Sequence, residues 1–287
     1  MSDRPSSKAA IESPDWSDAS ASKGLGSAAG FSHLWAIGAN TFREAIRSRV
    51  LYAVGIYGLV LLAAMLALPR IAGGAQFKML LDVGLAAMEA IAVAIALVAA
   101  SNAIDREIDK RTILVALSKP IARAEFVLGK VCGLAAVLAV AVAAMLALFA
   151  VALWVQQNDL GLELAVLSAG FLWLRLVLVV AIAIGFGTFS SGLLALLLSL
   201  TLYLIGNLSQ DLIRIGKATE NADLERLTRM LYLVLPDFSR LDIKNDAIYG
   251  FAGLPDAATL VGNVAYGIFY TALVLAIATG IFSRRQF

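Results

Sequence analysis

The ionisable residues inside long apolar stretches are the first candidates for chemistry, because a charge in lipid is costly and needs a partner. Asp82 and Glu89 lie seven residues apart in the apolar stretch Met79–Ala103, so they share one face of a helix. Asp82 lies near one end of this stretch, where water can solvate it. Glu89 lies deeper, as does Arg175 in the stretch Leu162–Phe189. We predict a Glu89–Arg175 ion pair, within a helical bundle or across a dimer.

The Glu89–Arg175 pair has two interpretations. It fixes the register of two helices, which is the role we favour, or it takes part in gating or in a substrate pathway. Residues for other chemistry are scarce. The single cysteine, Cys132, excludes an internal disulfide, a Cys-based zinc site and an iron–sulfur cluster held by this chain alone, and the single histidine, His33, argues against a histidine metal site. We therefore predict no catalytic residue, no metal and no cofactor on this chain.

The elements that hold these charges are long apolar runs. Hydrophobic residues make up 60% of the 287-residue chain and charged residues 15%, whereas soluble domains carry about a quarter charged residues. A membrane span needs about 20 mostly apolar residues, and helices satisfy their own backbone hydrogen bonds in lipid. We therefore predict an all-α polytopic membrane protein with six transmembrane helices, near Val50–Leu68, Met79–Ala103, Phe126–Val155, Leu162–Phe189, Gly192–Leu208 and Ala258–Phe282.

The flanks of these helices suggest an orientation. Residues 1–30 are rich in Ser, Ala and Gly, and we expect a disordered cytosolic tail there, with one six-helix domain over residues 31–287. The two short outer connections hold only Arg70 and Lys78 of the 23 Lys and Arg. The positive-inside rule then places both termini in the cytosol. We expect the membrane to be the inner (cytoplasmic) membrane of a bacterium. A net charge of +2 does not indicate nucleic-acid binding.

The segment His33–Arg49 has apolar residues along one helical stripe and Arg43, Glu44 and Arg47 on the other side. This pattern predicts an N-terminal amphipathic interfacial helix on the cytosolic leaflet. A simple basic flank of the first span is the alternative.

Two connections are longer than a turn requires. The cytosolic segment 104–125 has a charged first half, an apolar run Ile113–Leu117 and then Pro120. Its apolar run predicts a docking element for a soluble partner, because an ordinary solvated loop explains only the charges. The outer segment 209–257 has apolar residues at helical spacing up to Pro236. We expect an amphipathic helix packed on the bundle or on its symmetry mate, with contact to a periplasmic partner as the alternative.

The stretch EIDKRTILVALSKPIARAEFVLGK (Glu107–Lys130) resembles the first coupling region of the ABC-2 permeases, the membrane subunits of type-2 ABC transporters. PDFSRLDIKNDAIYG (Pro236–Gly250) and FSRRQF (Phe282–Phe287) are weaker points of similarity. Many relatives have glycine where this chain has Arg111. A basic residue there is common in the branch around multicopper-enzyme maturation, which this chain resembles most.

This resemblance implies an exporter half that pairs with a second permease copy, identical or paralogous, and binds two copies of a separate ABC ATPase. ATP and Mg²⁺ would be held by that partner, in agreement with the lack of a Walker A sequence here. The turn at Ser190–Ser191 would form a smaller second contact. The ATPase-coupling contacts would be Glu107, Arg111, Thr112, Ile113, Leu117, Pro120 and Arg123.

Two other functions remain as alternatives. A secondary transporter working without ATP would favour an inverted repeat and broken helices around midplane polar residues, and no clear repeat is visible. A membrane anchor of a larger envelope complex would make use of the long outer segment 209–257.

Overall fold

The computed structural model describes residues 38–39, 50–71, 76–109, 123–156, 160–209, 235–248 and 253–284, and single positions between 214 and 232. These residues form helices and connections, with no strand among them. The helices are α2 (Leu51–Ile71), α3 (Gln76–Asp109), α5 (Arg123–Val155), α6 (Leu160–Gly187), α7 (Gly192–Asn207), the 3₁₀ helix η3 (Phe238–Leu241), α10 (Lys244–Ile248) and α11 (Ala257–Arg284). The expected tail and most of the expected interfacial helix lie outside the described residues.

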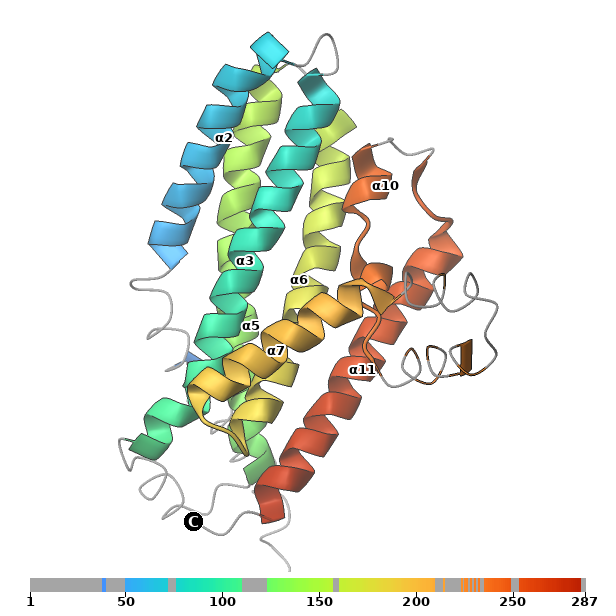
Figure 1. Cartoon of the computed structure of the whole chain (residues 1–287). Helices are drawn as coiled ribbons and strands as arrows, with labels where there is room; N and C mark the ends of the chain where they lie inside the picture. Colours follow the sequence, from blue (N-terminus) through green and yellow to red (C-terminus); the bar gives the residue numbers. More distant parts are fainter. Residues whose placement is uncertain are drawn as a thin grey trace, which may run out of the picture.

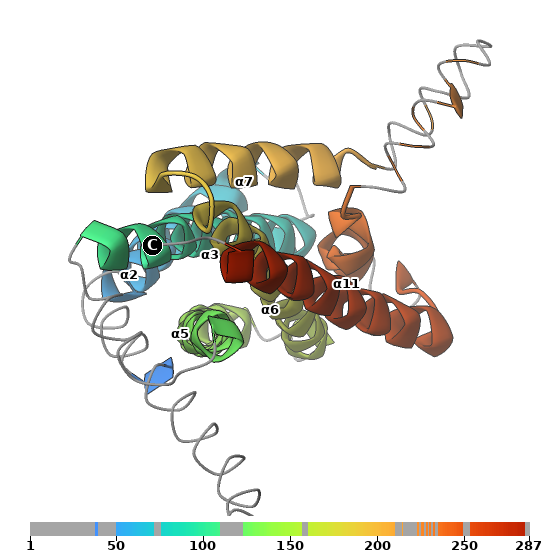
Figure 2. The same cartoon turned by 90° about the horizontal axis from the view of Figure 1, so that it is seen from below.

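Helices α2, α3, α5 and α6 form an up-and-down bundle, and α7 and α11 cross it obliquely (Figures 1 and 2). Helix α6 contacts α3, α5, α7 and α11. It can occupy this central position because its sequence is apolar on nearly every side, so burial on several faces leaves few polar groups without partners. The side chains of α6 thus reach several elements at once, including Arg175.

Among the residues that the structure describes, five helices are long and apolar enough to cross a membrane: α2, α3, α5, α6 and α11. Helix α7 has only 16 residues, which rise about 24 Å against a hydrocarbon thickness of about 30 Å. The expected count of six full spans is therefore not confirmed. The run Gly192–Leu208 is apolar enough for a span, but its helix begins after the turn at Ser190–Ser191 and ends at Asn207.

One end of the bundle gathers the end of α3, the start of α5, the α6–α7 turn and the end of α11 (bottom of Figure 1). Lys130 near the start of α5 donates to the carbonyl oxygen of Ala103 in α3, at 2.6 Å. The rings of Phe126 and Phe282 stack with centroids 6.0 Å apart, which ties α5 to α11. The end of α3 and the start of α5 therefore lie at the end of the bundle where α11 finishes.

The outward faces of the peripheral helices are apolar. Tyr52, Leu59 and Leu66 of α2 and Val261 and Phe269 of α11 are each at least two-thirds exposed. A water-soluble protein rarely exposes apolar patches of this extent. These faces fit lipid or another membrane subunit.

Candidate polar site within the helix bundle

Helices α3 and α6 bring two charges together inside the bundle. Arg175 Nη1 of α6 donates to Glu89 Oε1 of α3 at 2.6 Å, and the two side chains are 2% and 10% exposed. Both residues belong to the same chain, so this contact needs no second copy. The structure thus brings together the pair suggested by the sequence, and the role of the pair stays a prediction.

Helix α7 adds two polar side chains to the same site. Tyr203 donates its hydroxyl to Glu89 Oε1 at 2.7 Å, and Arg175 Nη2 donates to the amide oxygen of Asn207. Tyr203 and Asn207 are four residues apart and so lie on one face of the helix. The guanidinium carbon of Arg175 also lies 5.3 Å from the centroid of the Tyr203 ring, within reach of a cation–π interaction.

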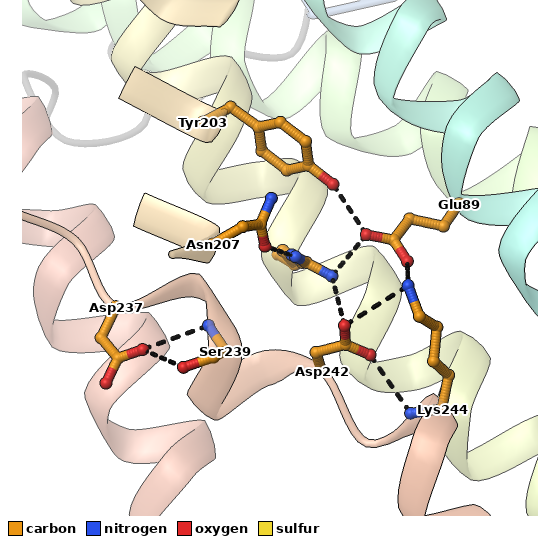
Figure 3. Close-up of polar contacts among 8 residues, drawn as sticks. Glu89, Tyr203, Asn207, Asp237, Ser239, Asp242 and Lys244 are labelled. Carbon is orange, nitrogen blue, oxygen red and sulfur yellow. Dashed lines mark hydrogen bonds and ion pairs between the residues drawn. The ribbon is translucent and has the colours of Figure 1, made fainter. Parts of the chain in front are cut away.

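Asp242, which follows η3, and Lys244, the first residue of α10, complete the site (Figure 3). The ammonium group of Lys244 donates to Glu89 Oε2 and lies 3.4 Å from Asp242 Oδ2. Arg175 Nη1 lies 3.5 Å from the same Asp242 oxygen. We call the six residues the polar cluster: Glu89, Arg175, Tyr203, Asn207, Asp242 and Lys244.

The polar cluster is electrically balanced, with two carboxylates and two cations. Each carboxylate faces both cations, which offsets the cost of removing the charges from water. The bonds also join α3, α6, α7 and the start of α10 in one network. The part of the chain that the structure describes contains no group of three or more His, Cys, Asp or Glu suited to a metal ion. The arrangement is thus suited to holding helices and to meeting a polar ligand.

A small cavity of about 20 Å³ lies beside the polar cluster, lined by Ser168, Arg175 and Asp242 among others. The Ser168 hydroxyl and Arg175 Nε are buried and have no hydrogen-bond partner within the described protein. A cavity of this size admits one water molecule, which could bond to both groups.

A second polar centre surrounds Asp237, outside the membrane-spanning helices. Its Oδ1 accepts from the Ser209 hydroxyl at 2.9 Å and from the Ser239 backbone N–H at 3.2 Å. Its Oδ2 accepts from the Tyr232 hydroxyl at 3.0 Å and from Arg240 Nε at 3.1 Å. Asp237 therefore ties the residues just after α7 to η3.

The charge of Asp237 is stabilised by these bonds. Burial acts to raise the pKa of Asp237, but the hydrogen bonds from Ser239, Ser209, Tyr232 and Arg240 outweigh it and hold the pKa below its usual value. The backbone N–H of Asp237 also donates to the Tyr266 hydroxyl at 2.8 Å, which links the centre to α11.

The expected coupling contacts are only partly described. Glu107 lies in the last turn of α3 and Arg123 is the first residue of α5, and nothing is described of their side chains. Arg111, Thr112, Ile113, Leu117 and Pro120 lie outside the described residues. Their role in coupling stays a prediction.

Four members of the polar cluster were not anticipated: Tyr203, Asn207, Asp242 and Lys244. Asp242 and Lys244 belong to the stretch Pro236–Gly250, whose sequence indicates a family resemblance but no contact with Glu89. Asn207 was a usable signal, because an amide near the end of an apolar run needs hydrogen-bond partners. Nothing in the pattern indicated that Lys244 reaches Glu89, 155 residues away.

Comparison with known proteins gives one clear result. A family model described as "ABC-2 family transporter protein" matches residues 35–287, which include all the described helices and both polar centres. A search of curated proteins found no match.

Proposed function

Because the chain belongs to the ABC-2 transporter family, we propose that it is the transmembrane permease subunit of an ATP-binding cassette exporter. In this proposal a separate subunit hydrolyses ATP, and the chain couples that reaction to movement of a substrate across the inner membrane. The observation that carries the proposal is the family match over residues 35–287. Five helices suited to crossing a membrane, found within the described part of the chain, agree with it.

Helix α3 offers a route for the coupling. Its last turn holds Glu107, and Glu89 of the polar cluster lies eighteen residues earlier in the same helix, a rise of about 27 Å. A helix transmits a displacement along its axis because its backbone hydrogen bonds resist compression. Closure of the ATPase against the connector 110–122 would then shift Glu89 relative to α6 and α7. We infer that the polar cluster is where this motion reaches the core.

The assembly follows from the same proposal. The permease pairs with a second copy or a paralogue, and two ABC ATPase subunits bind at the end where α3 finishes and α5 begins, bringing ATP and Mg²⁺. Both termini face the cytosol, and residues 33–49 form an interfacial helix on the inner leaflet. Residues 209–257 lie on the outer side, where they pack on the bundle or on its symmetry mate, with contact to a periplasmic partner as the alternative. The branch around multicopper-enzyme maturation is the part of the family that we favour.

The test is co-purification of the detergent-solubilised chain with its partners, identified by mass spectrometry. We expect wild type to recover a soluble ATPase, and Glu107→Ala/Arg123→Ala to recover several-fold less because the contact loses two charged groups. Glu163→Ala is the matched control, since it removes an exposed carboxylate at the start of α6, at the opposite end of the bundle.

Failure to recover an ATPase with any of these proteins would contradict the proposal. It would favour a transporter that works without ATP or a membrane anchor. Equal recovery with wild type and the double variant would keep the ATPase partner but remove Glu107 and Arg123 from the contact.

A further inference from the structure

A groove of about 480 Å³ lies between α3 and α7, and the polar cluster forms part of its lining. Helix α3 supplies a stripe at four-residue spacing, made of Ala86, Ala90, Ala94 and Val98, and α7 faces it with Leu196 and Leu200. Glu89, Tyr203 and Lys244 are the polar residues of the lining. The groove is therefore an apolar channel with polar groups toward the Glu89 end of the α3 stripe.

The groove exists because α7 is inclined. Small residues on a membrane helix normally let a neighbouring helix approach closely, yet Ala90, Ala94 and Val98 are exposed. Helix α7 crosses α3 obliquely (Figures 1 and 2), and Tyr203 holds it to α3 at Glu89. The α3 stripe beyond this contact is left open to whatever surrounds the bundle.

The dimensions of the groove fit one lipid chain. The stripe from Ala86 to Val98 covers twelve residues of rise, or about 18 Å. The acyl chains of one leaflet reach about 15 Å, half of the hydrocarbon thickness. Glu89 lies near the middle of the apolar span Gln76–Ala103, so a lipid whose head group reaches the polar end is drawn below the membrane surface, with its chain along α3 toward Val98.

The charges at the polar end select the head group. Glu89, Asp242, Arg175 and Lys244 sum to zero, so the site offers no net attraction for an anion. Lys244 has three N–H donors, of which two face Glu89 and Asp242, and its side chain is 25% exposed. The third donor suits a phosphate oxygen, and the Glu89 carboxylate beside it suits an ammonium group.

We propose that the α3–α7 groove binds one acyl chain of a zwitterionic phospholipid, such as phosphatidylethanolamine, with its head group against Lys244 and Glu89. The site belongs to the chain in its membrane and does not depend on coupling to an ATPase. An unspecific layer of lipid around the bundle is the competing explanation.

The test uses the full-length chain alone, reconstituted in vesicles of equal parts phosphatidylethanolamine and phosphatidylglycerol. A trace of phosphatidylethanolamine carrying a photoreactive diazirine on its acyl chain is added, and adducts are mapped by mass spectrometry after irradiation. We expect adducts concentrated on residues 86–98 and 196–203. Labelling of α7 should fall several-fold in Ala90→Phe/Ala94→Phe, because the rings fill the groove. It should stay unchanged in Ala63→Phe/Ala67→Phe, the same change at exposed positions of α2.

A second measurement needs no variant and so does not depend on folding of an altered chain. Excess unlabelled phosphatidylethanolamine should displace the label from the groove more effectively than excess phosphatidylglycerol. Labelling of α2 and α11 as strong as that of the groove, or no effect of the groove-filling change, would overturn the site. Equal displacement by both lipids would overturn the head-group assignment. No ATPase is present, so neither outcome bears on the proposed permease function.

Discussion

Glu89 is the residue on which the bonds of the polar cluster converge. One carboxylate oxygen accepts from Arg175 and Tyr203, and the other accepts from Lys244. A buried carboxylate stays charged only when such partners replace water. Glu89 therefore links α3 to α6, α7 and α10. The free energy lost on replacing Glu89 reflects all of these bonds and not the Arg175 ion pair alone.

An exchange of charges distinguishes a pair from a cluster. A pair predicts that Glu89→Arg/Arg175→Glu recovers the stability lost in either single variant. The cluster predicts no recovery, because the new arginine faces Lys244 and the new glutamate faces Asp242. We expect the double variant to stay destabilised by about 3–5 kcal/mol, measured by unfolding in mixed micelles. Adding Asp242→Lys/Lys244→Asp should restore part of the loss, and full recovery in the double variant would refute the cluster.

Asp237 predicts a dependence of stability on pH. Its folded pKa lies below the usual 3.8, so its bonds stabilise the folded state fully above that value and lose this effect as pH falls through the folded pKa. We expect Asp237→Asn to cost about 1–3 kcal/mol at neutral pH. The difference in free energy of unfolding between Asp237→Asn and wild type should shrink as the pH falls below 3.8, the usual pKa of an aspartate. Thermal unfolding across pH measures this, with the exposed Glu163→Gln as control; a gap independent of pH would exclude ionisation as the cause.

At the scale of elements, the packing of α3 depends on positions without side chains. Tyr57 of α2 donates to the carbonyl oxygen of Gly84 at 3.2 Å, and a Cβ at Gly84 would overlap the Phe149 ring of α5. Gly84 thus lets α3 approach two helices on different sides. Gly84 lies between the start of α3 and Glu89. The contact therefore holds the first part of α3, which is farther from the coupling end than the polar cluster.

Gly84→Ala should destabilise the bundle by about 1–3 kcal/mol, because overpacking displaces Phe149 or the helix axis. Gly170→Ala is the matched control, since a Cβ there meets nothing within 4 Å. It should be neutral or stabilising by about 1 kcal/mol. Unfolding in mixed micelles measures both. Equal effects of the two changes would show that helix propensity, and not the Phe149 contact, decides the result.

At the scale of the whole molecule, the alternating direction of the helices fixes which segments share an end. The ends of α3, α6 and α11 lie together, whereas the starts of α3 and α6 meet at the other end, where Phe77 lies close to Gly161. Helix α11 runs toward the end of the bundle where α3 and α6 finish. The end of α11 thus lies at the same end of the bundle as the α6–α7 turn.

Labelling of single cysteines tests the proposed orientation. With Cys132 replaced by alanine, Gln156→Cys at the end of α5 and Ser191→Cys at the α6–α7 turn place exposed thiols at opposite ends. An impermeant maleimide on intact cells should label Gln156→Cys strongly and Ser191→Cys only after permeabilisation. The reverse pattern would place the coupling end outside the cytosol and contradict the proposed contact with an ATPase.

The sequence by itself determined where the long helices lie, because a run of about 20 apolar residues has few stable forms in lipid. It also indicated that Glu89 and Arg175 need a partner, since both are charges within such runs. Only the tertiary structure decided that α7 is inclined and that Asp242 and Lys244 reach the same depth as Glu89. Apolar composition specifies burial but not the crossing angle, and pairing across 155 residues depends on how the helices pack. The groove between α3 and α7 follows from that packing.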